Sequence, residues 1–136
     1  YSGGTGAEIY GVTGVDFSHN RVIGGWSFGV RFYGCQDVQA NGNRGYNVGV
    51  SGNSPLLMFT KNSGSNTRES LNISASGNRI FDDRGTKYSQ WCVLLSDASD
   101  GVVMNGNNAR GGTSGAVAVL NVGTGTNVSA TGNLNN

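Results

Sequence analysis

The sequence predicts an all-β protein folded as a parallel β-solenoid of about five coils, in one domain that spans residues 1–136. A polar residue, Gly and Asn recur along the chain, as in "NGNRGY" from Asn41 and "SGNRIF" from Ser76. Short apolar segments with period-2 alternation precede these turns, which is the pattern of half-buried strands. Glycine is abundant, with 24 residues among 136, whereas average proteins contain about 7%. Strand repeats at this spacing are typical of solenoids.

The recurring asparagine sets the register of the repeat. Its five positions are Asn20, Asn43, Asn78, Asn107 and Asn133. Successive members are 23, 35, 29 and 26 residues apart. Asparagine tolerates left-handed backbone geometry in a turn, and its amide can hydrogen-bond to the same residue in the next coil. We therefore expect an asparagine ladder along the stack. A glycine precedes the later four asparagines and relieves crowding in the bend, whereas His19 stands before Asn20.

Each coil is expected to contain two strands before the asparagine and, in some coils, a short one after it. The first strands are predicted over residues 7–11, 29–34, 56–60, 92–96 and 116–122. The second strands place a β-branched residue five positions before each asparagine, at Val15, Val38, Ile73, Val102 and Val128. The short third strand is read from "RVIGG" at Arg21 and "RIFDD" at Arg79. Phe17, Phe32 and Phe59 are predicted in the core, whereas Lys61–Ser70 and Asp82–Gln90 are predicted as inserted polar loops.

Composition excludes several classes of function. The net charge is +1 and there is no basic run, so nucleic-acid binding is not expected. No apolar run approaches the ~20 residues of a transmembrane helix, so membrane insertion is not expected either. One histidine without suitable ligand spacing predicts no metal site, and we expect no cofactor. Cys35 and Cys92 either pair or stay free; we favour two small buried apolar residues.

Two features place the chain in a broader context. It begins at Tyr1 in the middle of the repeat pattern, so we expect the C-terminal part of a longer protein. The closing run "GGTSGAVAVLNVGTGTNVSATGNLNN" and the Gly/Ser/Asn-rich coils resemble the right-handed parallel β-helix of the pectate-lyase-like superfamily, in the style of phage tail spikes and tail-associated proteins.

That resemblance implies a right-handed coil and a phage or prophage tail-spike or tail-fibre segment. Its implied roles are recognition of host cell-surface polysaccharide and a rigid structural shaft. It further implies a homotrimer or assembly with other phage tail proteins, located in the virion or outside the cell. The same coil carries lyases, hydrolases, epimerases and inert shafts. A polysaccharide-degrading enzyme, either a glycoside hydrolase or a lyase, is therefore the alternative function.

The catalytic alternative depends on few acids. Glycoside hydrolysis usually needs two carboxyl groups ~5 to 9.5 Å apart. The candidates are Asp82 and Asp83 in one insertion, beside Arg84 and Lys87, and Asp97 and Asp100 one coil later. The structural interpretation is that "DDRG" is a solvated turn and that "SDASDG" forms Asx turns; we favour that interpretation.

The binding candidates are basic and aromatic. If the repeat is in register, the residues after three ladder asparagines, Arg21, Arg44 and Arg79, form a row that suits an anionic sugar. The structural interpretation is that these arginines extend into solvent beside the turn. The aromatic candidates for stacking on sugar rings are Trp26, Tyr46, Tyr88 and Trp91. The two tryptophans suit equally well a role in covering the flank of the core or in contacting another subunit.

Overall fold

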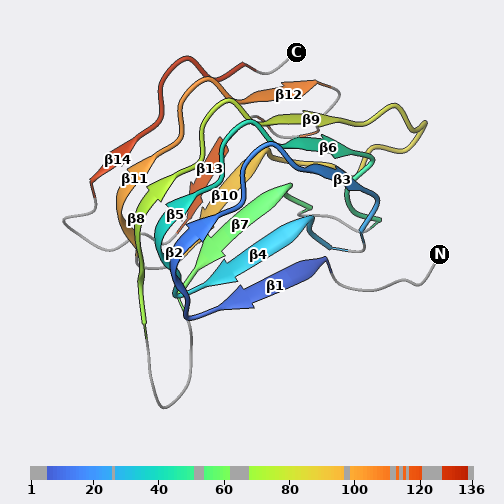
Figure 1. The fold of residues 1–136 in the computed structure, drawn as a ribbon. Coiled ribbons are helices and arrows are strands. Elements are labelled where there is room, and N and C mark those ends of the chain that lie inside the picture. The colour runs from blue at the N-terminus through green and yellow to red at the C-terminus, as the bar shows by residue number, and fades with distance from the viewer. Residues whose placement is uncertain are drawn as a thin grey trace.

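The chain is an all-β parallel solenoid of about four turns (Figure 1). The computed structural model describes residues 6–25, 27–50, 54–61, 68–96, 99–110, 113, 115, 117–120 and 127–134. Every strand pairing between the named strands is parallel, and the described residues contain no helix. The predicted fold class is confirmed. The right-handed sense of the coil stays a prediction that the resemblance implies.

The strands stack into three sheets. Sheet A contains β1 (Ala7–Tyr10), β4 (Val30–Tyr33), β7 (Leu57–Thr60), β10 (Val93–Ser96) and β13 (Val117–Leu120). Sheet B contains β2 (Thr13–Asp16), β5 (Gln36–Gln39), β8 (Ser70–Ser74), β11 (Ser99–Val103) and β14 (Val128–Ser129). Sheet C contains β3 (Arg21–Ile23), β6 (Arg44–Tyr46), β9 (Arg79–Phe81) and β12 (Asn108–Arg110). Four turns are complete, and the fifth predicted coil contributes β13 and β14 with no third strand among the described residues.

The core is a column of inward side chains in the predicted register. Val15 pairs with Val38, which pairs with Ile73 in the next coil. Val102 continues the row and pairs with Val128. Val38, Ile73 and Val102 are at most 1% exposed. Burying a side chain of this size contributes roughly 1.5–3 kcal/mol, so the period-2 pattern that predicted these strands also stabilises the stack.

Phenylalanines add a second part of the core. Phe32 and Phe59 are fully buried, and their rings stack with centroids 4.8 Å apart. Phe17 meets the Phe32 ring edge-on at 6.0 Å but is only partly buried, because it lies in the first coil. Cys35 and Cys92 are buried and unpaired, which agrees with the prediction of two small buried residues. Burial raises the pKa of the Cys92 thiol to about 12, which leaves it protonated and unreactive at neutral pH.

The turn asparagines form a continuous ladder through the stack. In each step the backbone N–H and the side-chain Nδ2 of one asparagine both donate to Oδ1 of the asparagine in the next coil. The backbone bonds from Asn20 to Asn43, Asn43 to Asn78, Asn78 to Asn107 and Asn107 to Asn133 are all 2.9 Å long. Asn43, Asn78 and Asn107 are fully buried. A buried amide with its hydrogen bonds satisfied fixes the bend and its register.

The residue before each ladder asparagine adopts a left-handed backbone. The φ angles are 66° at Gly42, 65° at Gly77, 63° at Gly106 and 62° at Gly132. His19 takes the same conformation, with φ of 60°. Glycine adopts this region without steric cost, and histidine is among the few other residues that visit it. The repeated Gly-Asn pair is therefore a turn motif, and His19 is a variant of it.

Sheet B contains a second left-handed row that the sequence reading missed. Gly14, Asp37, Asn72 and Gly101 have φ angles of 76°, 53°, 54° and 65°. Each stands one residue before the inward β-branched residue of its strand, and Asn72 donates from Nδ2 to Asp37 at 3.0 Å. Gly, Asp and Asn are the residues that tolerate this geometry. The signal was present, because all five coils carry Gly or an Asx residue at this position.

Candidate functional site

The outer face of sheet C carries three arginines in one row. Arg21 pairs in register with Arg44, and Arg44 with Arg79. The next member of the row is Asn108. All three arginines are exposed, whereas the residue directly after each of them lies on the inner face of its strand. Adjacent strands lie ~4.8 Å apart, so the row holds one cation per coil over the first three coils.

A second outward row runs beside the arginines. Ile23 pairs with Tyr46, Tyr46 with Phe81, and Phe81 with Arg110. The Tyr46 and Phe81 ring centroids are 5.7 Å apart, and the Arg110 guanidinium lies 5.5 Å from the Phe81 ring. Ile23 is 62% exposed. The face therefore presents aromatic and aliphatic surface next to positive charge.

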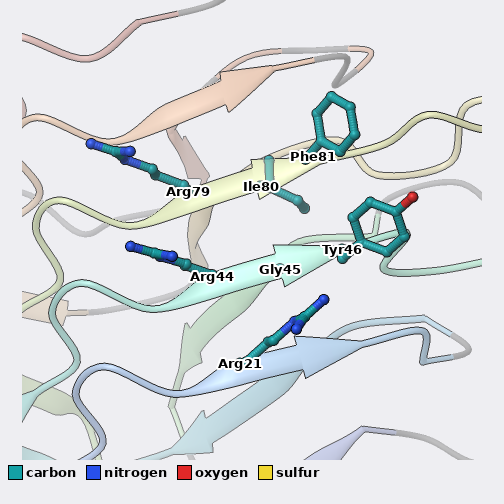
Figure 2. Close-up of a pocket in the computed structure, with 7 residues that line it drawn as sticks. All are labelled: Arg21, Arg44, Gly45, Tyr46, Arg79, Ile80 and Phe81. Carbon is teal, nitrogen blue, oxygen red and sulfur yellow. The ribbon is translucent and has the colours of Figure 1, made fainter.

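Between the two rows lies an open groove of about 470 Å³. Its lining residues are Arg21, Arg44, Gly45, Tyr46, Arg79, Ile80 and Phe81 (Figure 2). Arg21 leans toward Tyr46, whereas Arg44 and Arg79 extend together in the opposite direction. No carboxylate lines the groove among the described residues. An anion in the groove would meet guanidinium donors, aromatic rings and the Ile80 side chain.

The three guanidinium groups have no partner among the described residues: none forms a side-chain hydrogen bond or an ion pair there. Arg84 differs, because it is paired with Asp82. Like charges in a row repel one another, by about 1 kcal/mol for a pair 4 Å apart in water. An anionic ligand on this face would relieve that repulsion and gain charge-assisted hydrogen bonds.

Asp83 fixes the aromatic edge of the groove. Its carboxylate accepts hydrogen bonds from the Tyr46 hydroxyl and from Asn47 Nδ2, the latter at 2.9 Å. The Asp83 N–H donates back to Asn47 Oδ1 at 3.1 Å. The hydrogen bond from Tyr46 lowers the pKa of Asp83, and the same bond raises the pKa of Tyr46. Asp83 is therefore a carboxylate that orients the Tyr46 ring.

Asp82 is buried, so the expectation of a solvated turn is wrong at this residue. It is 1% exposed and accepts hydrogen bonds from Arg84 Nη2 at 2.6 Å and from the N–H groups of Tyr88 and Ser89 at 3.0 Å each. Burial alone would raise the pKa of Asp82, but the bonds from Arg84 and the backbone hold it well below its usual range. Asp82 is therefore the buried acceptor that ties Arg84, Tyr88 and Ser89 of the inserted loop together.

The remaining acidic candidates lie elsewhere. Asp100 lies in β11 of sheet B, directly before the left-handed Gly101. Its carboxylate accepts hydrogen bonds from the Gly101 N–H at 2.8 Å and from the Asn127 N–H at 2.7 Å. The bond from Asn127 lowers the pKa of Asp100. Asp97 lies outside the described residues. Asp82 and Asp83 thus follow sheet C, whereas Asp100 belongs to a turn-stabilising contact on sheet B.

Tyr46 is the one aromatic candidate that lines the groove. Tyr88 is half-buried in the 82–90 loop, with the Arg84 guanidinium 5.2 Å from its ring. Trp91 is also half-buried, and its carbonyl accepts from the Leu56 N–H at 2.9 Å. Trp26 lies outside the described residues. Phe81 belongs to the groove and was missed, although its place two residues after Arg79 matches that of Tyr46 after Arg44.

A separate polar and aromatic cluster lies on the outer side of sheet A. The Tyr10 and Tyr33 rings stack with centroids 4.3 Å apart and planes 4° from parallel. Tyr10 donates to Glu8 at 2.7 Å, and Arg31 donates to the Tyr33 hydroxyl. Arg31 also lies 4.9 Å from the Phe28 ring. These groups satisfy one another's hydrogen-bonding and charge requirements on the face of sheet A.

In the part of the chain that the structure describes, no group of three or more His, Cys, Asp or Glu residues is placed to hold a metal ion. No helix there is long and apolar enough to span a bilayer. No protein-family model, curated protein or solved structure matches the chain. Among the described residues, the groove on sheet C is the candidate site.

Proposed function

We propose that this chain is a rigid β-solenoid segment of a phage or prophage tail spike or tail fibre, and that it binds acidic polysaccharide of the host surface. The observation that carries the proposal is the groove between the arginine row and the Tyr46–Phe81 pair. Guanidinium groups bind carboxylates through paired hydrogen bonds. Exposed aromatic rings offer flat faces for the apolar faces of pyranose rings.

The solenoid suits the mechanical part of this role. The first four coils pair with one another through all three parallel sheets and through the buried asparagine ladder, so sheet C is a stiff platform with little freedom to collapse. A preformed surface loses less conformational entropy on binding. The whole assembly, a homotrimer or a complex with other tail proteins in the virion, belongs to the same proposal and follows from the resemblance of the repeat.

The direct test measures binding of polysaccharides that differ in charge, by calorimetry or glycan array at two salt concentrations. We expect binding of acidic chains, weaker binding at high salt because exposed charges are screened, and little binding of neutral chains. Arg44→Gln should weaken binding at least about tenfold, since a hydrogen bond to a charged group contributes roughly 1.5–3 kcal/mol. Lys61→Gln removes the same charge outside the groove and serves as the matched control.

Equal losses for Arg44→Gln and Lys61→Gln would contradict a site on sheet C. A reducing-end assay on the same polysaccharides tests the enzymatic alternative. Repeated turnover that disappears in Asp83→Asn would favour a degrading enzyme, because Asp83 is the described carboxylate next to Tyr46 at the groove edge.

A further inference from the structure

Two walls of side chains set the direction of the groove on sheet C. One wall is the arginine row, and the other is the outward row that includes Tyr46 and Phe81. Both walls run from coil to coil, because their members pair in register. Between them Gly45 and Ile80 are buried and form the floor. The groove therefore follows the axis of the stack, and a ligand laid along the strands would have to cross both walls (Figure 2).

The dimensions of the groove agree with that direction. Neighbouring strands of a sheet lie ~4.8 Å apart, so the backbones of Arg21 and Arg79 are about 10 Å apart along the axis. The two walls are two residues apart along each strand, which is about 7 Å at ~3.3 Å per residue. The groove is thus longer along the axis than it is wide, and it suits an extended chain that runs from coil to coil.

The positive charge of the arginine row is spread over three coils. Arg44 and Arg79 extend together, whereas Arg21 leans toward Tyr46, so one small anion cannot contact all three guanidinium groups. No carboxylate among the described residues lines the groove. A ligand with a single negative charge would leave most of the repulsion within the row in place. A chain with one acidic group at each coil would pair each guanidinium with its own anion.

The spacing of the coils matches a polymer of acidic sugars. An extended polysaccharide advances by nearly one coil spacing for each pyranose unit, so neighbouring units would lie over neighbouring coils. Tyr46 and Phe81 also come from neighbouring coils, and their ring centroids are 5.7 Å apart. Each ring can therefore contact one sugar unit. A carboxylate on every unit, rather than on every second one, would place an acidic group beside the arginine of each coil.

We propose that the groove binds a polyuronate, a polysaccharide with a carboxylate on each successive sugar unit, and that the bound chain lies along the solenoid axis across β3, β6 and β9. This inference rests on the proposed function and makes it more specific, because it gives the class of sugar and the orientation of the chain. The geometry of guanidinium favours carboxylates, since its N–H groups match the two carboxylate oxygens.

The first experiment is calorimetry of the wild-type chain with two kinds of oligosaccharide. Mannuronate oligomers carry a carboxylate on every unit, whereas hyaluronan oligosaccharides carry one on every second unit. We expect the affinity for mannuronate oligomers to rise from the dimer to the trimer as a further arginine is engaged. At equal numbers of carboxylates, the mannuronate oligomer should bind at least roughly tenfold more tightly, which corresponds to one charged contact.

The second experiment extends the arginine row by one coil. Asn108 is the register partner of Arg79, so Asn108→Arg adds a guanidinium at the next position along the axis. It should tighten binding of the mannuronate tetramer roughly two- to fivefold, the range of a new exposed ion pair, and leave binding of the dimer nearly unchanged. Val103→Arg adds the same charge on sheet B, where Val103 is 40% exposed, and is the matched control.

The outcomes separate this inference from the proposed function. Equal affinities for mannuronate and hyaluronan oligomers, or equal gains from Asn108→Arg and Val103→Arg, would overturn the polyuronate alignment and leave an acidic-polysaccharide site in place. Absence of binding to every acidic polysaccharide would overturn the proposed function and this inference with it. If Asn108→Arg does not fold, the comparison of oligomers with the wild-type chain still decides.

Discussion

At the scale of single residues, Asn and Asp have three different roles in this chain. Buried Asn78 is a rung of the ladder that fixes the turn. Asp82 is a buried carboxylate whose oxygens are saturated by Arg84 and by backbone N–H groups. Asp83, one residue later, is exposed and holds Tyr46 at the groove edge. Asn and Asp have nearly the same size and shape, so burial and hydrogen-bond partners decide which of these roles each residue has.

Asp82 makes a prediction about pH. Because the folded protein holds the pKa of Asp82 below its unfolded value of about 3.9, the carboxylate contributes stability above that value. That contribution is lost as the pH falls toward the folded pKa. Asp82→Asn should therefore destabilise the protein by about 2 kcal/mol at pH near 7, and by less near pH 3. Denaturant unfolding at the two pH values checks this; a deficit that grows on acidification would contradict it.

At the scale of strands and turns, the left-handed rows are the devices that bend the chain. A Cβ on Gly106 or on Gly85 would meet no atom within 4 Å, but only Gly106 has positive φ, at 63°. Gly106→Ala should therefore destabilise the protein by roughly 1–2 kcal/mol through backbone strain alone. Gly85→Ala should be close to neutral. Thermal unfolding of the two variants measures the cost of backbone strain, because neither added Cβ contacts another atom. Equal shifts in Tm would show that the bend at Gly106 needs no left-handed residue.

The same elements show how far sequence reasoning reaches in a solenoid. Val38, Ile73 and Asn78 could be predicted because each coil imposes the same steric demand on the same position, so the demand recurs as a pattern. The burial of Asp82 could not, because it depends on a loop that occurs in one coil only. The arginine row could be predicted, because each arginine directly follows a ladder asparagine. The contact between Phe81 and Tyr46 could not, because predicting it requires the position of the third strand in both coils.

At the scale of the whole molecule, stability should vary along the solenoid axis. Each coil contacts only its neighbours, so a terminal coil has one stabilising interface and an internal coil has two. Val15 in the first coil is partly buried, whereas Val38 and Ile73 are at most 1% exposed. We therefore expect the first coil to open locally more often than the second and third.

Native-state hydrogen exchange measures this gradient directly. Amides of β2 and β3 should exchange at least roughly tenfold faster than those of β5, β6 and β8, which corresponds to about 1.4 kcal/mol less protection. Uniform protection along the axis at low concentration would mean that the solenoid opens as a single unit and that its end coil is no weaker than its centre.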